Sequence, residues 1–179
     1  GLFPYDVSKS CADLLCRSFA HTYDLPVSTT RSANIYGPAD INLSRVIPGT
    51  IVSLLKDESP IIRSDGTPIR EFIHVDDVVA GYLAVAENID MTRGEAFNLG
   101  TNEPIGILDL VNKIIRLSGR ENQIEPTVML SRKIDREIDA QYLSAEKIEA
   151  TLGWKPSINM DEGLTATIDW YSDHITVFT

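Results

Sequence analysis

Apolar and polar residues alternate along the 179-residue chain with two different periods. Apolar side chains recur every three or four residues within 6–22, which predicts an amphipathic helix. The same spacing predicts helices over 44–56, 76–88, 107–119, 144–154 and 160–174. Short apolar runs between turn residues predict strands over 70–75, 95–100 and 125–130, and one strand that runs into a loop within 25–37. Because strands alternate with helices, the pattern predicts an α/β fold with some parallel sheet.

Turn and capping residues mark where several of these helices begin and end. Pro4 suits the start of the first helix, because its missing N–H would be unpaired there anyway. Ser44 is a candidate N-cap for the second helix. Gly119 and Gly153 follow apolar periodic segments and are suited to close them.

The charge balance limits the partners that this chain can have. It carries 16 Lys and Arg against 26 Asp and Glu, a formal net charge of −10. An acidic chain repels nucleic acid and anionic membrane surfaces, so neither is an expected partner. An anionic small ligand would need a local group of arginines.

Neither a membrane span nor a metal site is indicated. The most apolar run, 78–86, is too short to cross a bilayer, and no signal-peptide pattern is visible. Cys11 and Cys16 fall on different faces of the first predicted helix, so we do not expect them to pair. The three histidines are scattered and no Cys-x-x-Cys occurs. We therefore expect a cytoplasmic protein with no metal.

The segment "PYDVSKS" places a phenol and an ammonium one helical turn apart. Tyr5 and Lys9 are at positions i and i+4, so both side chains can reach one ligand. A neighbouring ammonium favours the phenolate form, and such a tyrosine can take a proton from a hydroxyl while a hydride leaves the same carbon. The alternative is an exposed tyrosine beside a solvated lysine.

Five segments, in this order, resemble the NAD-dependent epimerase/dehydratase family, the extended short-chain dehydrogenases that act on nucleotide sugars. They are "PYDVSKSCADLL", "TTRSANIYGP", "RSDGTPIREFIHVDDVVAGYLAVAE", "AFNLGT" and "LGWKPSINMDEGLTATIDWY". Within the family, four segments are most similar to the CDP-glucose 4,6-dehydratases: "YDVSKSCADLL", "GPADINLSRVIPGTI", "IIRSDGTPIREFIHVDD" and "EIDAQYLSAEKIEATLGW".

The resemblance implies a division of the chain. It implies the C-terminal portion of a Rossmann-like extended short-chain dehydrogenase with a small α/β substrate-binding domain. Residues 1–37 would end the NAD-binding Rossmann domain, and 38–179 would mainly form the nucleotide-sugar domain, with residues around 70–100 returning to the Rossmann sheet. No glycine-rich dinucleotide loop occurs in the sequence. We therefore expect a piece of a longer protein that binds NAD weakly or not at all by itself.

The resemblance also implies the residues that contact the NAD cofactor. Tyr5 would be the catalytic tyrosine, and Lys9 its partner, which also holds the ribose hydroxyls of the nicotinamide nucleotide. The loop within 25–37 would run past the nicotinamide end of NAD, where the backbone of Ser32, Ala33 and Ile35 would contact the cofactor.

The implied nucleotide-sugar contacts are Asn34, Asn42, Arg45, Arg70, Arg132 and Arg136. An amide at Asn34 donates to phosphate without adding charge, and a guanidinium at Arg70 suits bidentate recognition of phosphate. Other interpretations remain open for Asn34, Arg70, Arg132 and Arg136. Asn34 could be a turn residue, Arg70 could pair with Glu71 or Asp65, and the two later arginines could be a solvated charge run.

Three functions follow from the resemblance. The first is a 4,6-dehydratase that acts on CDP-glucose with catalytic NAD, oxidising C4 of the hexose before water leaves across C5 and C6. The second is a nucleotide-sugar 4-epimerase on the same scaffold. The third is an inactive fragment that serves as a binding or dimerisation module. The full-length protein is expected to be a homodimer.

Overall fold

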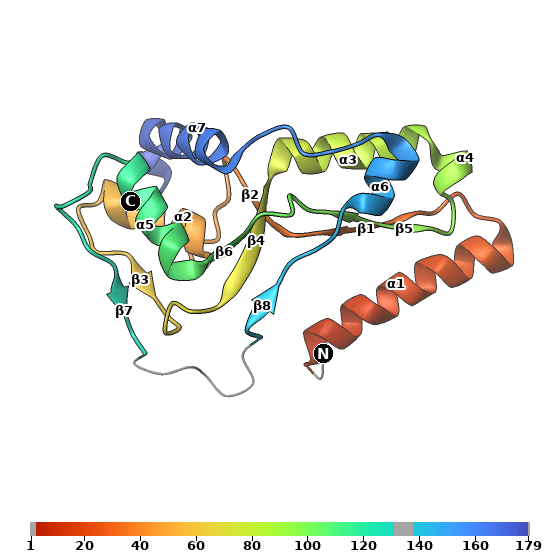
Figure 1. Cartoon of the computed structure of the whole chain (residues 1–179), viewed down its shortest axis with the longest axis horizontal. Coiled ribbons are helices and arrows are strands. Elements are labelled where there is room, and N and C mark those ends of the chain that lie inside the picture. Colours follow the sequence, from red (N-terminus) through yellow and green to blue (C-terminus); the bar gives the residue numbers. More distant parts are fainter. Residues whose placement is uncertain (1–2, 131–137, 179) are drawn as a thin grey trace.

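The computed structural model describes residues 3–130 and 138–178. It is an α/β arrangement, which confirms the predicted fold class (Figure 1). Its elements in chain order are α1 (Pro4–Tyr23), β1 (Thr29–Ser32), β2 (Asn34–Tyr36), α2 (Val46–Leu55), β3 (Ile61–Ile62), β4 (Ile69–His74), α3 (Val75–Glu87), α4 (Ile89–Thr92), β5 (Ala96–Leu99), β6 (Pro104–Gly106), α5 (Ile107–Leu117), β7 (Thr127–Val128), β8 (Ala140–Gln141), α6 (Glu146–Leu152), α7 (Met160–Asp173) and the 3-10 helix η1 (Ile175–Phe178).

Within residues 3–130 and 138–178 the strands form three separate sheets. β1 pairs with β5 in parallel, and β3 pairs with β7 in parallel. β4 is the centre of the largest sheet: β2 and β8 run parallel to it, and β6 runs antiparallel. Most pairings are parallel, as the alternation of strands and helices predicts.

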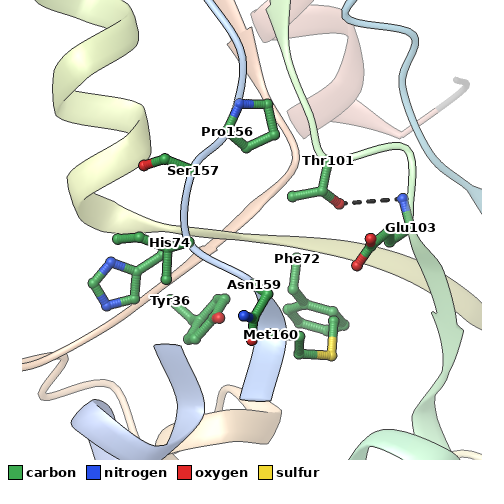
Figure 2. A pocket seen from close by; sticks show the side chains of 10 residues that line it. Tyr36, Phe72, His74, Thr101, Glu103, Pro156, Ser157, Asn159 and Met160 are labelled. Carbon is green, nitrogen blue, oxygen red and sulfur yellow. Dashed lines mark hydrogen bonds between the residues drawn. The ribbon is translucent and has the colours of Figure 1, made fainter. Parts of the chain in front are cut away.

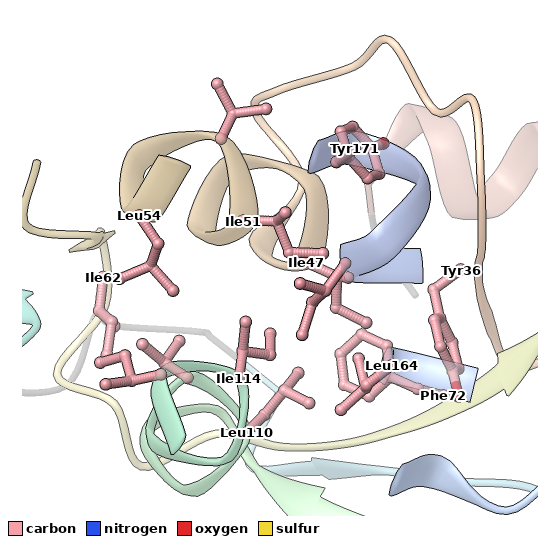
Figure 3. Close-up of a cluster of buried hydrophobic side chains, with 14 residues drawn as sticks. Tyr36, Ile47, Ile51, Leu54, Ile62, Phe72, Leu110, Ile114, Leu164 and Tyr171 are labelled. Atoms are coloured by element: carbon pink, nitrogen blue, oxygen red, sulfur yellow. The ribbon is translucent and has the colours of Figure 1, made fainter. Parts of the chain in front are cut away.

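One apolar core lies where α2, α5 and α7 pack together against β2 and β4 (Figure 3). α5 places a stripe of four buried side chains in it, because apolar residues recur at helical spacing along its sequence. The fully buried residues of this core include Ile51, Leu54, Leu110, Ile114, Leu164 and Tyr171.

A second core lies between the β1–β5 pair and the helices α3 and α6. Its buried members are Ile73, Val78, Val85, Phe97, Leu99, Ala145, Ile148 and Trp154. Gly81 of α3 lets the helix approach the sheet closely, since a Cβ there would lie 2.8 Å from Leu99 Cδ2. Ile73 of β4 belongs to this second core and Phe72 to the first, so the strand is shared by both.

Helix α1 contacts the rest of the chain sparsely. Ala20 is its single buried residue among those described. An ion pair between Asp13 and Arg31, at 2.8 Å, joins it to β1, and Figure 1 shows it lying along one side of the β1–β5 pair. None of the helices in the described ranges is both long enough and apolar enough to cross a membrane.

Two local predictions are wrong. The segment 25–37, predicted as one strand that runs into a loop, contains two strands, because the chain bends at Ala33 and changes its pairing partner from β5 to β4. Ser44 does not cap the second helix: α2 begins at Val46, and Arg45 is its N-cap. Gly153, in contrast, closes α6 with φ +67, as predicted.

Candidate functional site

Asn34 and Arg70 lie on neighbouring parallel strands. In the register of β2 against β4, Asn34 is opposite Phe72, two residues beyond Arg70. The Asn34 side-chain amide donates to the backbone oxygen of Glu71 at 3.0 Å. Asn34 is therefore a strand residue bonded to β4, and its alternative interpretation as a turn residue is wrong. We call Asn34 and Arg70, with the strands that carry them, the β2–β4 platform.

The Arg70 guanidinium is held by backbone oxygens on one side. Its Nη1 donates to Ile69 O at 2.8 Å and to Ile138 O at 2.9 Å. Among the described residues, neither its Nε nor its Nη2 has a hydrogen-bond partner, and neither Glu71 nor Asp65 pairs with it. N–H groups on one edge of a guanidinium can pair with two oxygens of an anionic group such as a phosphate.

The carboxylate of Glu71 lies inside the protein, with 1% of the residue exposed. Its Oε1 accepts from the Thr101 and Asn102 backbone N–H groups at 2.5 and 2.7 Å. Its Oε2 accepts from the Leu143 N–H at 2.7 Å. The sequence suggested Glu71 only as a partner for Arg70. An acidic residue within an apolar strand could have indicated a buried carboxylate, because such a group requires hydrogen-bond donors around it.

Asn42 and Arg45 lie on the exposed loop before α2 and make local contacts. Arg45 Nη1 pairs with Asp40 Oδ2 at 2.9 Å. Asn42 Oδ1 accepts from the Ser44 backbone N–H at 3.1 Å. Among the described residues, no hydrogen bond or ion pair joins either side chain to Asn34 or Arg70.

Tyr5 and Lys9 face each other on α1, as their spacing predicts. Lys9 Nζ lies 5.4 Å from the centroid of the Tyr5 ring. Tyr5 is 69% exposed, so its phenol is open to a ligand. No hydrogen bond or ion pair within the described ranges joins this pair to Asn34 or Arg70.

The three predicted backbone contacts to a cofactor lie where the chain passes from β1 to β2. Ser32 ends β1 opposite Leu99, and the Ala33 N–H donates to Leu99 O at 2.9 Å. Ile35 on β2 is 41% exposed. Arg132 and Arg136 lie outside the described residues.

A cavity of about 220 Å³ opens beside β2 and β4. Figure 2 shows Tyr36 and Phe72 at its base, with Asn159 and Met160 of the chain entering α7 beside them. Sequence reasoning did not predict it, because its walls come from segments more than a hundred residues apart. None of the predicted site residues that the structure describes lines it.

Buried polar groups surround this cavity. The Asp76 N–H donates to His74 Nδ1 at 3.3 Å. Asp77 accepts from the backbone N–H groups of Ser157 and Ile158 at 2.9 and 3.1 Å. Burial raises the pKa of the Tyr36 phenol, and the carboxylate of Asp77 raises that pKa further. These groups fix the junction of α3 and α7, and the Tyr36 phenol stays protonated at neutral pH.

The arrangement can bind an anion and, separately, present a phenol beside an ammonium. The β2–β4 platform offers guanidinium and amide N–H groups, and α1 offers Tyr5 with Lys9. No group of three or more metal-ligating side chains gathers anywhere in residues 3–130 or 138–178.

Comparison with known proteins identifies relatives over nearly the whole chain. The NAD dependent epimerase/dehydratase family matches residues 2–100. A mouse dTDP-D-glucose 4,6-dehydratase is 34% identical over 171 residues, which are 94% of this chain and 47% of the mouse protein. The low-salt glycan biosynthesis protein Agl12 of Haloferax volcanii is 34% identical over 170 residues, 94% of this chain and 52% of that protein. The chain spans about half the length of the curated relatives that it matches.

Solved structures show the same fold. The dTDP-glucose 4,6-dehydratase of Bacillus anthracis, solved in complex with NAD, aligns with a TM-score of 0.85 and 28% identity, over 97% of this chain and 53% of that one. The UDP-glucose 4-epimerase of Thermotoga maritima, solved with UDP-glucose, aligns with a TM-score of 0.83 and 26% identity, over 96% of this chain and 54% of that one.

Proposed function

The chain belongs to the NAD-dependent epimerase/dehydratase family, and on that premise we propose that it binds the nucleotide sugar of an NAD-dependent 4,6-dehydratase. The observation that carries this proposal is the Arg70 guanidinium. Two backbone oxygens hold its Nη1, and its Nε and Nη2 have no partner among the described residues. A guanidinium presented in this way matches the paired oxygens of a diphosphate.

Asn34 complements Arg70 at the same site. One N–H of its amide is used by Glu71 O, and an amide has a second N–H to donate. This donor adds no charge, so it contributes direction while Arg70 neutralises the diphosphate. In an acidic chain with a net charge of −10, anion binding depends on such a local arrangement.

Arg45 and Asn42 are proposed to contact the nucleoside at the edge of this site. Both lie on the exposed loop before α2, and each has a local partner to exchange for the ligand. An exposed ion pair contributes little stability, so Arg45 can leave Asp40 at low cost. Arg132 and Arg136 keep their proposed role at the diphosphate.

Tyr5 and Lys9 are proposed to perform the chemistry at C4 of the hexose. The ammonium of Lys9 lies close to the Tyr5 ring and both side chains are exposed, so the pair can accept a proton from the sugar hydroxyl. Lys9 would also donate to the ribose hydroxyls of NAD, while Ser32, Ala33 and Ile35 pass its nicotinamide end. NAD supplies the hydride acceptor when bound; the 179 residues contain no glycine-rich loop for its diphosphate.

The two apolar cores support the proposed division into domains. The core between the β1–β5 pair, α3 and α6 would belong to the Rossmann part, and the core of α2, α5 and α7 to the nucleotide-sugar part. Ile148 of α6 and Trp154 pack in the core beside the β1–β5 pair. We therefore extend the segments proposed to return to the Rossmann part beyond 70–100 to include residues 145–154.

Relatives and sequence motifs favour different nucleotides. Curated relatives are named for dTDP-glucose and UDP-glucose, whereas the segment "GPADINLSRVIPGTI" resembles the CDP-glucose enzymes. We propose CDP-glucose as the substrate, in a cytoplasmic homodimer. A 4-epimerase is the second candidate, since the epimerase of Thermotoga maritima shares the fold and 26% identity.

Binding tests the proposal on the chain itself. CDP, dTDP and UDP are titrated calorimetrically into the wild-type chain and into Arg70→Ala. We expect binding that Arg70→Ala weakens at least about tenfold, the loss of about 1.4 kcal/mol. Equal affinity of the two proteins would refute the site.

Turnover decides between the reactions. The protein purified from its native cells is incubated with NAD and each of CDP-glucose, dTDP-glucose and UDP-glucose. A 4-keto-6-deoxy product, recorded by its absorbance in alkali, supports the dehydratase. Formation of the C4 epimer instead identifies the second candidate.

A further inference from the structure

Glu71 is next to Arg70 in sequence, but its side chain points elsewhere and serves a different purpose. We propose that Glu71 is a positioning residue, whose carboxylate fixes the two strands that flank Arg70 and so orients the guanidinium. The inference rests on the proposed role of Arg70 in binding a nucleoside diphosphate. It concerns how the site is preorganised rather than which groups touch the ligand.

Both oxygens of the carboxylate are used, and by different segments. Oε1 accepts the N–H groups of Thr101 and Asn102 at 2.5 and 2.7 Å, and also the Thr101 hydroxyl at 3.2 Å. Oε2 accepts the Leu143 N–H at 2.7 Å. One buried side chain therefore ties β4 to the loop after β5 and to the segment after β8.

These two segments continue directly into the strands on either side of Arg70. The loop of Thr101 and Asn102 leads into β6, in which Ile105 is opposite Arg70. Leu143 follows β8, in which Gln141 is opposite Arg70. Anchoring both segments on Glu71 thus fixes the frame around the arginine.

The same frame supplies the group that orients the guanidinium. Arg70 Nη1 donates to Ile138 O at 2.9 Å, and the Ile69 N–H donates to Asp139 O at 2.8 Å. Ile138 lies two residues before β8. If the segment is released at Leu143, the oxygen that holds Arg70 loses one of the contacts that anchor it.

A glycine makes room for this carboxylate. A Cβ at Gly100 would lie 2.7 Å from Glu71 Oε1 and 3.1 Å from Oε2. That approach is too close for the carboxylate to keep its position. Gly100→Ala is therefore a second way to displace the carboxylate, which leaves Glu71 itself intact.

Asp77 provides a matched control in the same molecule. It is also a buried carboxylate, 2% exposed, and it also accepts backbone N–H groups, those of Ser157 and Ile158. It ties α3 to the segment before α7, and neither segment flanks Arg70. Replacing Asp77 measures the effect of losing a buried carboxylate without losing the frame around the arginine.

The experiment compares Glu71→Gln, Gly100→Ala and Asp77→Asn by arginine side-chain NMR without ligand. In Glu71→Gln an amide nitrogen, which cannot accept, replaces one acceptor oxygen. We expect slow rotation of the Arg70 guanidinium in the wild-type chain and in Asp77→Asn. We expect averaged, exchange-broadened Arg70 signals in Glu71→Gln and Gly100→Ala. An ordered Arg70 in either of these two folded variants would overturn the proposal.

A double-mutant cycle with CDP, dTDP or UDP adds a readout that a merely structural role would not change. Glu71→Gln should weaken nucleotide binding about three- to tenfold, and should have no further effect when Arg70 is already alanine. Additive losses would overturn the proposal. If the wild-type chain binds none of the nucleotides, the proposed function fails, while the NMR comparison still decides the role of Glu71.

Discussion

Helices α5 and α1 both carry apolar side chains at helical spacing, but they differ in how far those side chains are buried. In α5, Leu110 and Ile114 are fully buried against α2 and α7. In α1, Leu14 and Leu15 remain 63% and 57% exposed. Helical periodicity therefore identifies the face that can be buried, while the presence of a covering element is a separate property of the fold.

The two regions also divide the proposed functions. The sheet around β4 carries the proposed diphosphate contacts, whose side chains are held by hydrogen bonds to backbone oxygens. α1 carries the proposed chemical pair on an exposed surface. Mutations in the packed sheet and mutations on the sparsely packed helix should therefore have different effects on stability and on nucleotide affinity.

The largest difference is expected from matched truncations in the two stripes. Ile114→Ala removes a fully buried side chain and should lower the free energy of unfolding by about 2–5 kcal/mol. Leu14→Ala, on exposed α1, should change it by no more than about 0.5 kcal/mol. Urea denaturation followed by circular dichroism measures both values. Similar losses in the two variants would show that α1 is packed as α5 is.

The second-largest difference is expected in nucleotide affinity, between a variant of β4 and a variant of α1. Arg70→Ala should weaken binding of a nucleoside diphosphate by about tenfold to a hundredfold, because a charge-assisted bidentate contact is lost. Tyr5→Phe, which removes only the phenol oxygen of α1, should leave that affinity unchanged. Calorimetric titration gives both dissociation constants. Arg116→Ala, in an exposed ion pair with Asp161, serves as the charge control.

The packed region should also respond to high pH. Burial and, to a lesser extent, the Asp40 carboxylate raise the pKa of Tyr171 from 10.0 to about 12. The hydrogen bond that its hydroxyl donates to Asp40 O at 2.6 Å acts in the opposite direction. The protonated phenol is thus favoured in the folded state, so its stabilisation is complete below pH 10 and is lost as the pH rises toward about 12.

Tyr171→Phe tests this titration. The variant should lose about 1 kcal/mol of stability at neutral pH through the missing hydrogen bond, and its stability should fall less steeply between pH 10 and 12 than that of the wild type. Tyr142→Phe, at a 60% exposed position, should retain the wild-type slope. An unchanged slope in Tyr171→Phe would contradict the assignment.

The smallest effect is expected at the ionic link between the regions. Asp13→Asn removes the ion pair with Arg31, whose side chain is 48% exposed. Exposed pairs contribute about 0–1 kcal/mol, so the midpoint of urea denaturation should move only slightly. A loss above about 2 kcal/mol would mean that this pair, rather than Ala20, holds α1 in place.

The sequence predicts the long helices well because their apolar period is strong. The predicted helices 107–119 and 160–174 end within two residues of α5 and α7. The two-residue strands β3 and β8 form by pairing with distant segments, and no local pattern predicted them, whereas the predicted strand 125–130 contains β7. The break at Ala33 has the same cause, since β1 and β2 pair with different strands.

The candidate site shows the same limit. The adjacency of Tyr5 and Lys9 follows from their spacing on one helix. The contact between Asn34 and the backbone of Glu71 joins residues 37 positions apart, and the anchoring of Thr101, Asn102 and Leu143 on Glu71 depends on three separate segments. Such contacts require the sheet register, which the sequence pattern does not supply.

The most direct test of the central claim is a titration of CDP, dTDP and UDP followed by NMR at two side chains of the β2–β4 platform. We predict that at least one nucleotide causes saturable chemical-shift changes of the Asn34 side-chain amide and of the Arg70 Nε–H. The matching nucleoside should change neither chemical shift. Unchanged signals with all three nucleotides, at concentrations that saturate related diphosphate sites, would contradict the account.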